Sequence, residues 1–100
     1  MNIENSDKDY LQILRKIKKK NYSQRELAND LGFSLGKINY CLKSLKEKGF
    51  VKIENFKKSQ NKIKYFYILT PAGLSAKAKL TVRFMKRIMK EYDDLKKEIE

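Results

Sequence analysis

The apolar positions between Gln24 and Cys41 have the spacing of two packed helices joined by a tight turn. Counted from Gln24, they fall at the fourth, eighth, tenth, fifteenth and eighteenth positions, which are Leu27, Leu31, Phe33, Ile38 and Cys41. The small Ala28 allows the helices to cross closely, and Gly32 can take the left-handed conformation that ends the first helix. The pattern predicts helices over Gln24–Leu31 and Leu35–Lys48, capped by Ser23 and Ser34. The second helix of such a pair commonly enters a DNA major groove.

An amphipathic helix precedes this pair, and a hairpin follows it. Residues 7–19 place Tyr10, Leu11, Leu14 and Ile17 on one face, and Ser6 with Asp9 resembles a capping box. After Gly49 the period changes to two over residues 50–56, and residues 63–69 are rich in β-branched and aromatic residues. The polar residues 57–62 between them predict a turn. Three helices followed by such a hairpin make a winged helix.

The last element reads as one long helix. Thr70 can cap it, and Pro71 at its first position loses no needed hydrogen bond. Leu80, Val82 and Phe84 widen the apolar stripe of its first half, as packing against the domain requires. A helix over residues 71–99 is ~43 Å long at 1.5 Å per residue, longer than the domain before it, so we expect its far half to bury its stripe against a partner. The stripe has heptad spacing and predicts a dimer interface at Leu74, Ala78, Thr81, Met85, Ile88, Tyr92, Leu95 and Ile99.

These elements predict a mainly α protein with a small β-hairpin, an α+β fold. We expect a winged helix-turn-helix domain over residues 1–70 and a coiled-coil dimerisation helix over residues 71–100.

The charge of +12 is unevenly distributed. From Leu31 to Lys90 there are fifteen Lys or Arg against two acids, whereas Glu91–Glu100 has five acids against two Lys. The middle of the chain should attract a polyanion, although a genome-wide bias towards Lys, Asn and Ile would also produce this basicity. The absence of a signal peptide and of a membrane-spanning apolar run favours the cytoplasm and argues against a membrane.

The composition gives little support to catalysis. The chain has no His, no P-loop and no CxxC pair, so we expect no enzyme activity, no cofactor and no metal site. The neighbouring Asp93 and Asp94 are interpreted as exposed charges that favour solubility, not as a catalytic pair. The single Cys41 excludes an intramolecular disulfide, and it reads either as a small buried hydrophobe or as a redox sensor.

The candidate DNA contacts lie on the second helix of the pair and on the hairpin. Asn39 can make a bidentate contact to adenine, Lys37 can reach guanine or a phosphate, and Tyr40 can contact a phosphate or a thymine methyl. Both sets of residues also have an explanation without DNA. The helix face could be an ordinary solvated surface, and the Lys residues of the hairpin could discourage strand pairing between molecules. The expected recognition-helix contacts are Ser34, Gly36, Lys37, Asn39, Tyr40 and Lys43, and the expected wing contacts are Lys57, Lys58, Asn61, Lys62 and Lys64.

The chain resembles the small MarR-type transcriptional regulators associated with exopolysaccharide (EPS) operons. The resemblance is carried by residues 23–28, 34–43, 48–52 and 69–73. It implies a bacterial, dimeric winged-helix protein that binds DNA through residues 34–43 and the hairpin. Members of the wider MarR family are usually longer and dimerise through helices at both termini, often around a small-molecule pocket. This chain has a short N-terminal helix and a single long C-terminal one, which argues against a small-molecule effector cleft here. They often have Asp and Arg near the wing tip, where this chain has Asn61 and Lys62.

The leading hypothesis is therefore a sequence-specific regulator that binds double-stranded DNA as a homodimer, with exopolysaccharide or surface-polysaccharide genes as targets. A winged-helix protein-interaction module with a hetero-oligomeric coiled coil is the alternative. Binding to structured RNA is a third possibility, motivated by the same charge.

Overall fold

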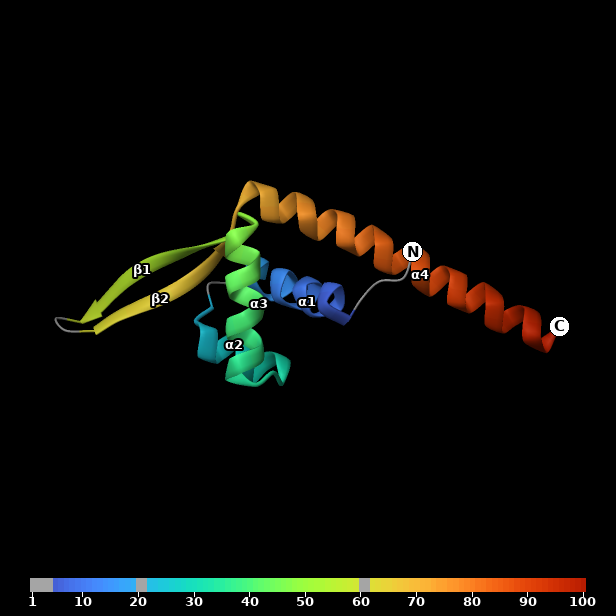
Figure 1. Ribbon diagram of the computed structural model, residues 1–100, viewed down its shortest axis with the longest axis horizontal. Coiled ribbons are helices and arrows are strands. Elements are labelled where there is room, and N and C mark those ends of the chain that lie inside the picture. Colours follow the sequence, from blue (N-terminus) through green and yellow to red (C-terminus); the bar gives the residue numbers. More distant parts are fainter. Residues whose placement is uncertain (1–4, 20–21, 60–61) are drawn as a thin grey trace.

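The computed structural model confirms the predicted α+β fold with a long C-terminal helix (Figure 1). It describes residues 5–19, 22–59 and 62–100, with side chains at 7–17, 22–54 and 65–100. The elements follow one another as α1 (Asn5–Lys19), α2 (Gln24–Leu31), α3 (Leu35–Glu47), β1 (Val51–Ser59), β2 (Lys62–Leu69) and α4 (Pro71–Ile99).

Local capping interactions define the ends of α2 and α3 as predicted. The Ser23 hydroxyl accepts a hydrogen bond from the Glu26 amide at 3.2 Å, and the Glu26 carboxylate accepts one from the Ser23 amide at 3.3 Å. Gly32 has a φ of 69°, and the Ser34 hydroxyl accepts from the Lys37 amide at 3.1 Å. The predicted start of the first helix was wrong in one detail, because α1 includes Asn5 and Ser6. Helix starts are defined only to within a residue or two when polar residues flank them.

The core forms where the first three helices meet. The predicted inward positions of α1 and α3 are buried, and Leu31 and Phe33 pack against them half-exposed. Ile13 is fully buried as well, so the apolar face of α1 is wider than its periodicity indicated. Each fully buried Leu or Ile contributes ~1.5–3 kcal/mol relative to an exposed one. Among the described side chains, the seven most buried are those of Ile13, Leu14, Leu27, Ile38, Leu42, Leu45 and Val51.

The hairpin is longer than predicted. Its strands are antiparallel, Val51 pairs with Leu69, and the pairing continues to Lys57 opposite Ile63 and, after a register shift, Ser59 opposite Lys62. Residues 57–59 and 62, predicted as part of a turn, are therefore strand residues. Ladder hydrogen bonds join backbone groups, so a ribbon can continue through polar residues. The Tyr67 amide also donates to the Tyr22 carbonyl at 3.0 Å, which attaches the base of the hairpin to the segment before α2.

Short hydrogen bonds connect the end of α3, the base of the hairpin and the start of α4. Gly49, with a φ of 78°, ends α3 as predicted, and the Phe50 amide donates to the Leu45 carbonyl at 2.9 Å. The Thr70 hydroxyl donates to the Gly49 carbonyl at 2.6 Å and accepts from the Gly73 amide at 3.0 Å. Thr70 therefore caps α4 and also ties it to the end of α3.

Gly73 allows α4 to begin directly against the hairpin. It is buried, and a Cβ at this position would overlap the Phe50 carbonyl oxygen and lie 2.8 Å from Leu69 Cδ1. Only a residue without a side chain fits this close approach.

Helix α4 has the predicted bounds and leaves the body on the side opposite the hairpin (Figure 1). Leu80 packs against the core, and Arg83 Nη1 lies 3.6 Å from Asp7 Oδ2 of α1. Val82, expected to pack against the domain, is instead 50% exposed, because it lies on the side of α4 turned away from the core. Every residue from 85 to 100 is exposed, so the second half of α4 extends beyond the body. None of the described helices has the length and apolar character needed to cross a membrane.

Candidate nucleic-acid interface

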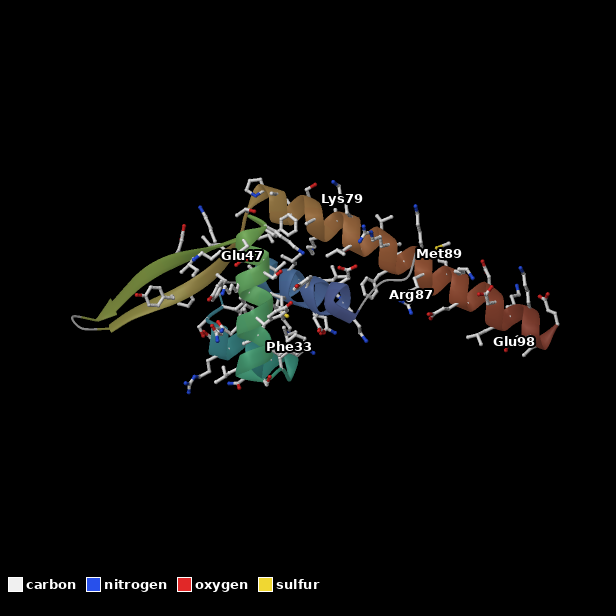
Figure 2. All side chains as sticks on the ribbon, viewed as in Figure 1. Phe33, Glu47, Lys79, Arg87, Met89 and Glu98 are labelled. Carbon is white, nitrogen blue, oxygen red and sulfur yellow. The ribbon has the colours of Figure 1, made fainter. Side chains whose placement is uncertain are left out.

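The face of α3 opposite the core is open. Ile38, Cys41, Leu42 and Leu45 are buried on one side of this helix. On the other side the predicted contact residues are accessible, and the Tyr40 side chain is 70% exposed. Figure 2 shows the helix between the labelled Phe33 and Glu47. The exposed predicted residues are Ser34, Gly36, Lys37, Asn39, Tyr40 and Lys43.

Lys37 differs from the other predicted contacts because its ammonium group has partners within the chain. Its Nζ lies 3.2 Å from Asp9 Oδ2 and 4.1 Å from the centre of the Phe33 ring. The side chain is 45% exposed. Lys37 would give up contacts to α1 and to the turn in order to reach a base, so it is less available than Asn39 or Lys43.

A hydrogen bond on the same flank fixes α3 to α1. The Tyr10 hydroxyl of α1 donates to Ser44 Oγ of α3 at 3.1 Å, and the Lys48 ammonium group lies 5.0 Å from the centre of the Tyr10 ring. These contacts, with the Lys37–Asp9 pair, hold the orientation of α3 on the body. A recognition surface needs such a rigid support.

Leu35 is an exposed apolar residue that the sequence did not single out as a contact. It is the first residue of α3 and its side chain is 50% exposed. Its spacing from Ile38 and Leu42 is that of an inward position, but at the first position of the helix its side chain is not covered. An apolar side chain here can contact a thymine methyl group.

The predicted wing residues lie towards the distal end of the hairpin. In the strand register Lys64 pairs with Phe56, Lys62 with Ser59, and Lys57 with Ile63. Lys58 lies on β1 next to this end, and Asn61 is outside the described residues. The side chains of the four lysines are outside the described ones as well. Figure 1 shows the hairpin reaching away from the body, so these backbone positions lie far from the core.

A comparison with protein families agrees with this geometry. Residues 6–52 match the model described as "Winged helix-turn-helix DNA-binding". The chain carries a winged helix-turn-helix domain. The match covers α1 to the start of β1, and the structure adds the hairpin. No curated protein matches the chain.

Three solved structures with the same fold are transcriptional regulators by title. The putative transcriptional regulator TA0346 from Thermoplasma acidophilum is 27% identical with a TM-score of 0.74, over 90% of this chain and 91% of that chain. The regulator BldR from Sulfolobus solfataricus is 20% identical with a TM-score of 0.76, over 94% of this chain and 64% of that chain. A PadR family regulator from Clostridium difficile R20291 is 24% identical with a TM-score of 0.65, over 83% of this chain and 97% of that chain. The chain thus spans less than two thirds of BldR and nearly all of the other two.

Within the winged helix-turn-helix domain, Cys41 is part of the core. It is 4% exposed. Burial raises the pKa of the Cys41 thiol above its usual value, Asp9 raises it further, and Lys37 opposes the shift. The thiol therefore stays protonated at neutral pH, and the environment is that of a small buried hydrophobe.

The predicted dimer interface lies on α4, and the winged helix-turn-helix domain leaves most of its residues exposed. Thr81 is half-buried, and its hydroxyl donates to the Lys77 carbonyl at 2.7 Å. Val82 and Met89 extend the exposed apolar surface beyond the predicted positions. The other predicted residues are exposed, namely Leu74, Ala78, Met85, Ile88, Tyr92, Leu95 and Ile99.

The described residues contain no cluster of His, Cys, Asp or Glu that could hold a metal ion.

Proposed function

We propose that this chain is a DNA-binding transcriptional regulator that acts as a homodimer. The observation that carries the proposal is the exposed face of α3 in a winged helix-turn-helix domain. The titles of the similar structures support the same class of function. A regulator of this kind would act on double-stranded DNA in the cytoplasm.

The first turns of α3 would enter the major groove. Asn39 can accept from and donate to an adenine edge, Tyr40 can reach a phosphate or a thymine methyl, and Gly36 permits close approach of the backbone. Lys43 lies a turn further along and would contact a phosphate. In this mechanism the phosphate contacts supply much of the affinity, and Asn39 with Tyr40 supplies discrimination between sequences.

The distal end of the hairpin would add contacts outside the major groove. Four lysines on β1 and β2 could neutralise phosphates or line the neighbouring minor groove. Lys62 would bring charge without the planar fork of an arginine, so this contact would be electrostatic rather than bidentate.

Two copies would bind two successive major grooves. In such dimers the recognition helices lie ~34 Å apart, and the operator is a pseudo-palindrome. The exposed apolar positions of α4 supply the interface for this arrangement. Motifs that resemble the exopolysaccharide-associated regulators extend the proposal to surface-polysaccharide genes, which the neighbouring genes on the chromosome would test.

The main experiment is footprinting on the protein's own promoter, followed by titration at two salt concentrations. We expect a protected pseudo-palindrome. Asn39→Ala should relax the preference for that site by ~1–3 kcal/mol, and Lys43→Ala should lower the salt slope by about 1 for all sequences. Lys97→Ala removes an exposed charge far from α3 and is the matched control. Equal affinity for all sequences would contradict sequence-specific binding.

Two further measurements separate the alternatives. Competition between duplex DNA and structured RNA should leave the DNA complex intact, and preferential displacement by RNA would favour the RNA-binding hypothesis. Sedimentation of the pure protein should show a dimer. A clean monomer would indicate that α4 pairs with a different chain.

A further inference from the structure

Helix α4 has two apolar faces, and the winged helix-turn-helix domain covers one of them. On the covered face Gly73 is buried and Leu80 packs against the core. On the adjacent face Leu74 is 46% exposed and Met85 is 57% exposed. With 3.6 residues per turn, the two pairs lie on different sides of the same helix. The second face is therefore apolar without serving the core of its own domain.

This second face runs along the whole of α4. Val82 and Met89 widen it, and Figure 2 shows the labelled Met89 on the side of α4 away from the winged body. Large contiguous apolar patches on a protein surface mark interaction sites. The face, called here the α4 seam, consists of Leu74, Ala78, Thr81, Met85, Ile88, Tyr92, Leu95 and Ile99.

We infer that the α4 seam binds the α4 seam of a second copy in antiparallel orientation. The inference rests on the homodimer proposed above and adds the direction and register of the pairing. Residue sizes, flanking residues and charge each favour this direction over the parallel one.

The sizes of the seam residues are complementary only when the helices run in opposite directions. The near half of the seam has the small Ala78 and Thr81, whereas the far half has the large Tyr92 and Leu95. In an antiparallel register with Met85 against the partner's Ile88, Ala78 packs against the partner's Leu95 and Thr81 against the partner's Tyr92. A parallel pair would place Ala78 on Ala78 and leave a void there, which close-packed interfaces avoid.

The residues that flank the seam are also complementary when the two helices are antiparallel. In the antiparallel register Val82 lies beside the partner's Met89, so two exposed apolar side chains cover each other. Lys77 lies beside the partner's Glu98, an attractive pair that occurs twice by symmetry. In a parallel coiled coil Val82 would flank the partner's Lys77 instead.

The charge along α4 is also complementary in this direction. Residues 71–90 have six Lys or Arg and no acid, whereas residues 91–100 have five acids and two Lys. The net charges of these segments are therefore +6 and −3. In the antiparallel register, residues 73–82 with net charge +2 lie beside the partner's residues 91–100 with net charge −3. Residues 83–90, with net charge +4, face their own copy in either direction. Parallel pairing also places −3 beside −3. Like charges along a coiled coil select against the arrangement that juxtaposes them.

The antiparallel register also separates the two winged domains. Residues 74–99 overlap over ~38 Å at 1.5 Å per residue. Each domain sits at the start of its own α4, so the two domains lie at opposite ends of the paired helices. The length of α4 then determines the distance between the two α3 helices.

Disulfide trapping in the full chain tests the direction. Ala78→Cys and Leu95→Cys are made separately, oxidised alone and oxidised as a mixture, and native protein with its buried Cys41 is the control. We expect the mixture to form a disulfide between one chain of each kind, identified by mass, and neither variant to cross-link with itself. Two copies of position 78 are ~25 Å apart along an antiparallel pair, whereas a disulfide needs Cα atoms within about 7 Å.

The outcomes distinguish this inference from the proposed function. A dimer in which Ala78→Cys cross-links with itself would overturn the antiparallel direction and leave the homodimer standing. A dimer without any cross-link would place the interface elsewhere. A monomer by sedimentation would overturn both the inference and the homodimer.

A charge exchange tests the register by a route that does not depend on a cysteine at the interface. Lys77→Glu and Glu98→Lys should each raise the dimer dissociation constant, by roughly three- to tenfold. Their equimolar mixture should restore native affinity, because each mixed dimer contains only attractive pairs. Equal weakening in the mixture would overturn the register.

Discussion

Helices α3 and α4 have similar apolar stripes, but the structure uses them differently. The stripe of α3 is buried against its own chain, where Ile38 and Leu42 are at most 1% exposed. The α4 seam is exposed along most of its length, and Ile99 is 86% exposed. An amphipathic pattern therefore shows that a helix has a face to bury, but not what will cover that face.

The difference also separates stability from function. In α3 the buried side supports the exposed contacts proposed for DNA. A core mutation there should therefore lower the stability of the domain and weaken DNA binding together. In α4 the seam lies outside the core, so a mutation there should change assembly while the winged domain stays folded.

The largest expected effect is on the core side of α3. Leu42→Ala should lower the free energy of unfolding by ~2–5 kcal/mol, because it leaves a cavity among fully buried residues. Urea denaturation monitored by circular dichroism measures this change. Leu95→Ala makes the same chemical change on the α4 seam, and at concentrations where the protein is monomeric it should cost under about 0.5 kcal/mol. Equal losses would show that the seam packs against its own domain.

Ile88→Lys should break assembly without unfolding the domain. Two charged side chains at the centre of the seam should raise the dimer dissociation constant at least about 100-fold, or ~2.7 kcal/mol. Met85→Lys should behave similarly, and both should weaken operator binding. Sedimentation equilibrium measures the dissociation constant, and Ile88→Leu is the conservative control. A variant that stays fully dimeric would place the interface elsewhere.

Gly73→Ala should destabilise the junction between α4 and the hairpin by ~1–3 kcal/mol. The added Cβ would overlap the Phe50 carbonyl oxygen, and the start of α4 must shift. Gly36→Ala in α3 is the matched control. Nothing lies within 4 Å of a Cβ there, so the higher helix propensity of Ala should raise stability by up to about 1 kcal/mol. Thermal unfolding of both variants measures the difference in stability between them. Equal stabilities would show that the start of α4 does not pack closely against the hairpin.

The smallest expected effects compare the two helix caps. Ser34→Ala removes one hydrogen bond at the start of α3 and should cost ~0.5–1 kcal/mol. Thr70→Ala removes both the α4 cap and the bond to Gly49 and should cost about 1–2 kcal/mol. Chemical denaturation of the two variants gives the order, and a greater loss for Ser34→Ala would contradict the dual role of Thr70.

Much of the fold was predictable because its signals are local. The caps at Ser23, Ser34 and Thr70 and the left-handed turns at Gly32 and Gly49 each depend on residues within a few positions. The bounds of α2 and α4 followed from these signals. The length of the hairpin did not, because ladder pairing does not depend on the polarity that marked residues 57–62 as a turn.

The candidate site was predictable in outline. The outward positions of α3 follow from its period, and Asn39, Tyr40 and Lys43 are exposed as expected. Leu35 was not among the predicted contacts, and the structure exposes its side chain at the first position of the helix. Whether the predicted α3 and wing residues contact DNA stays a prediction for the experiments above.

The sequence by itself determined where the helices and strands lie and which side of each helix is apolar, because these properties arise from neighbouring residues. Only the tertiary structure decided that Lys37 pairs with Asp9, that Gly73 abuts Phe50 and that the α4 seam lies beside the covered face of the helix. These outcomes depend on which residues distant in the chain come to lie opposite one another. Chain packing determines that arrangement, and periodicity within one segment does not record it.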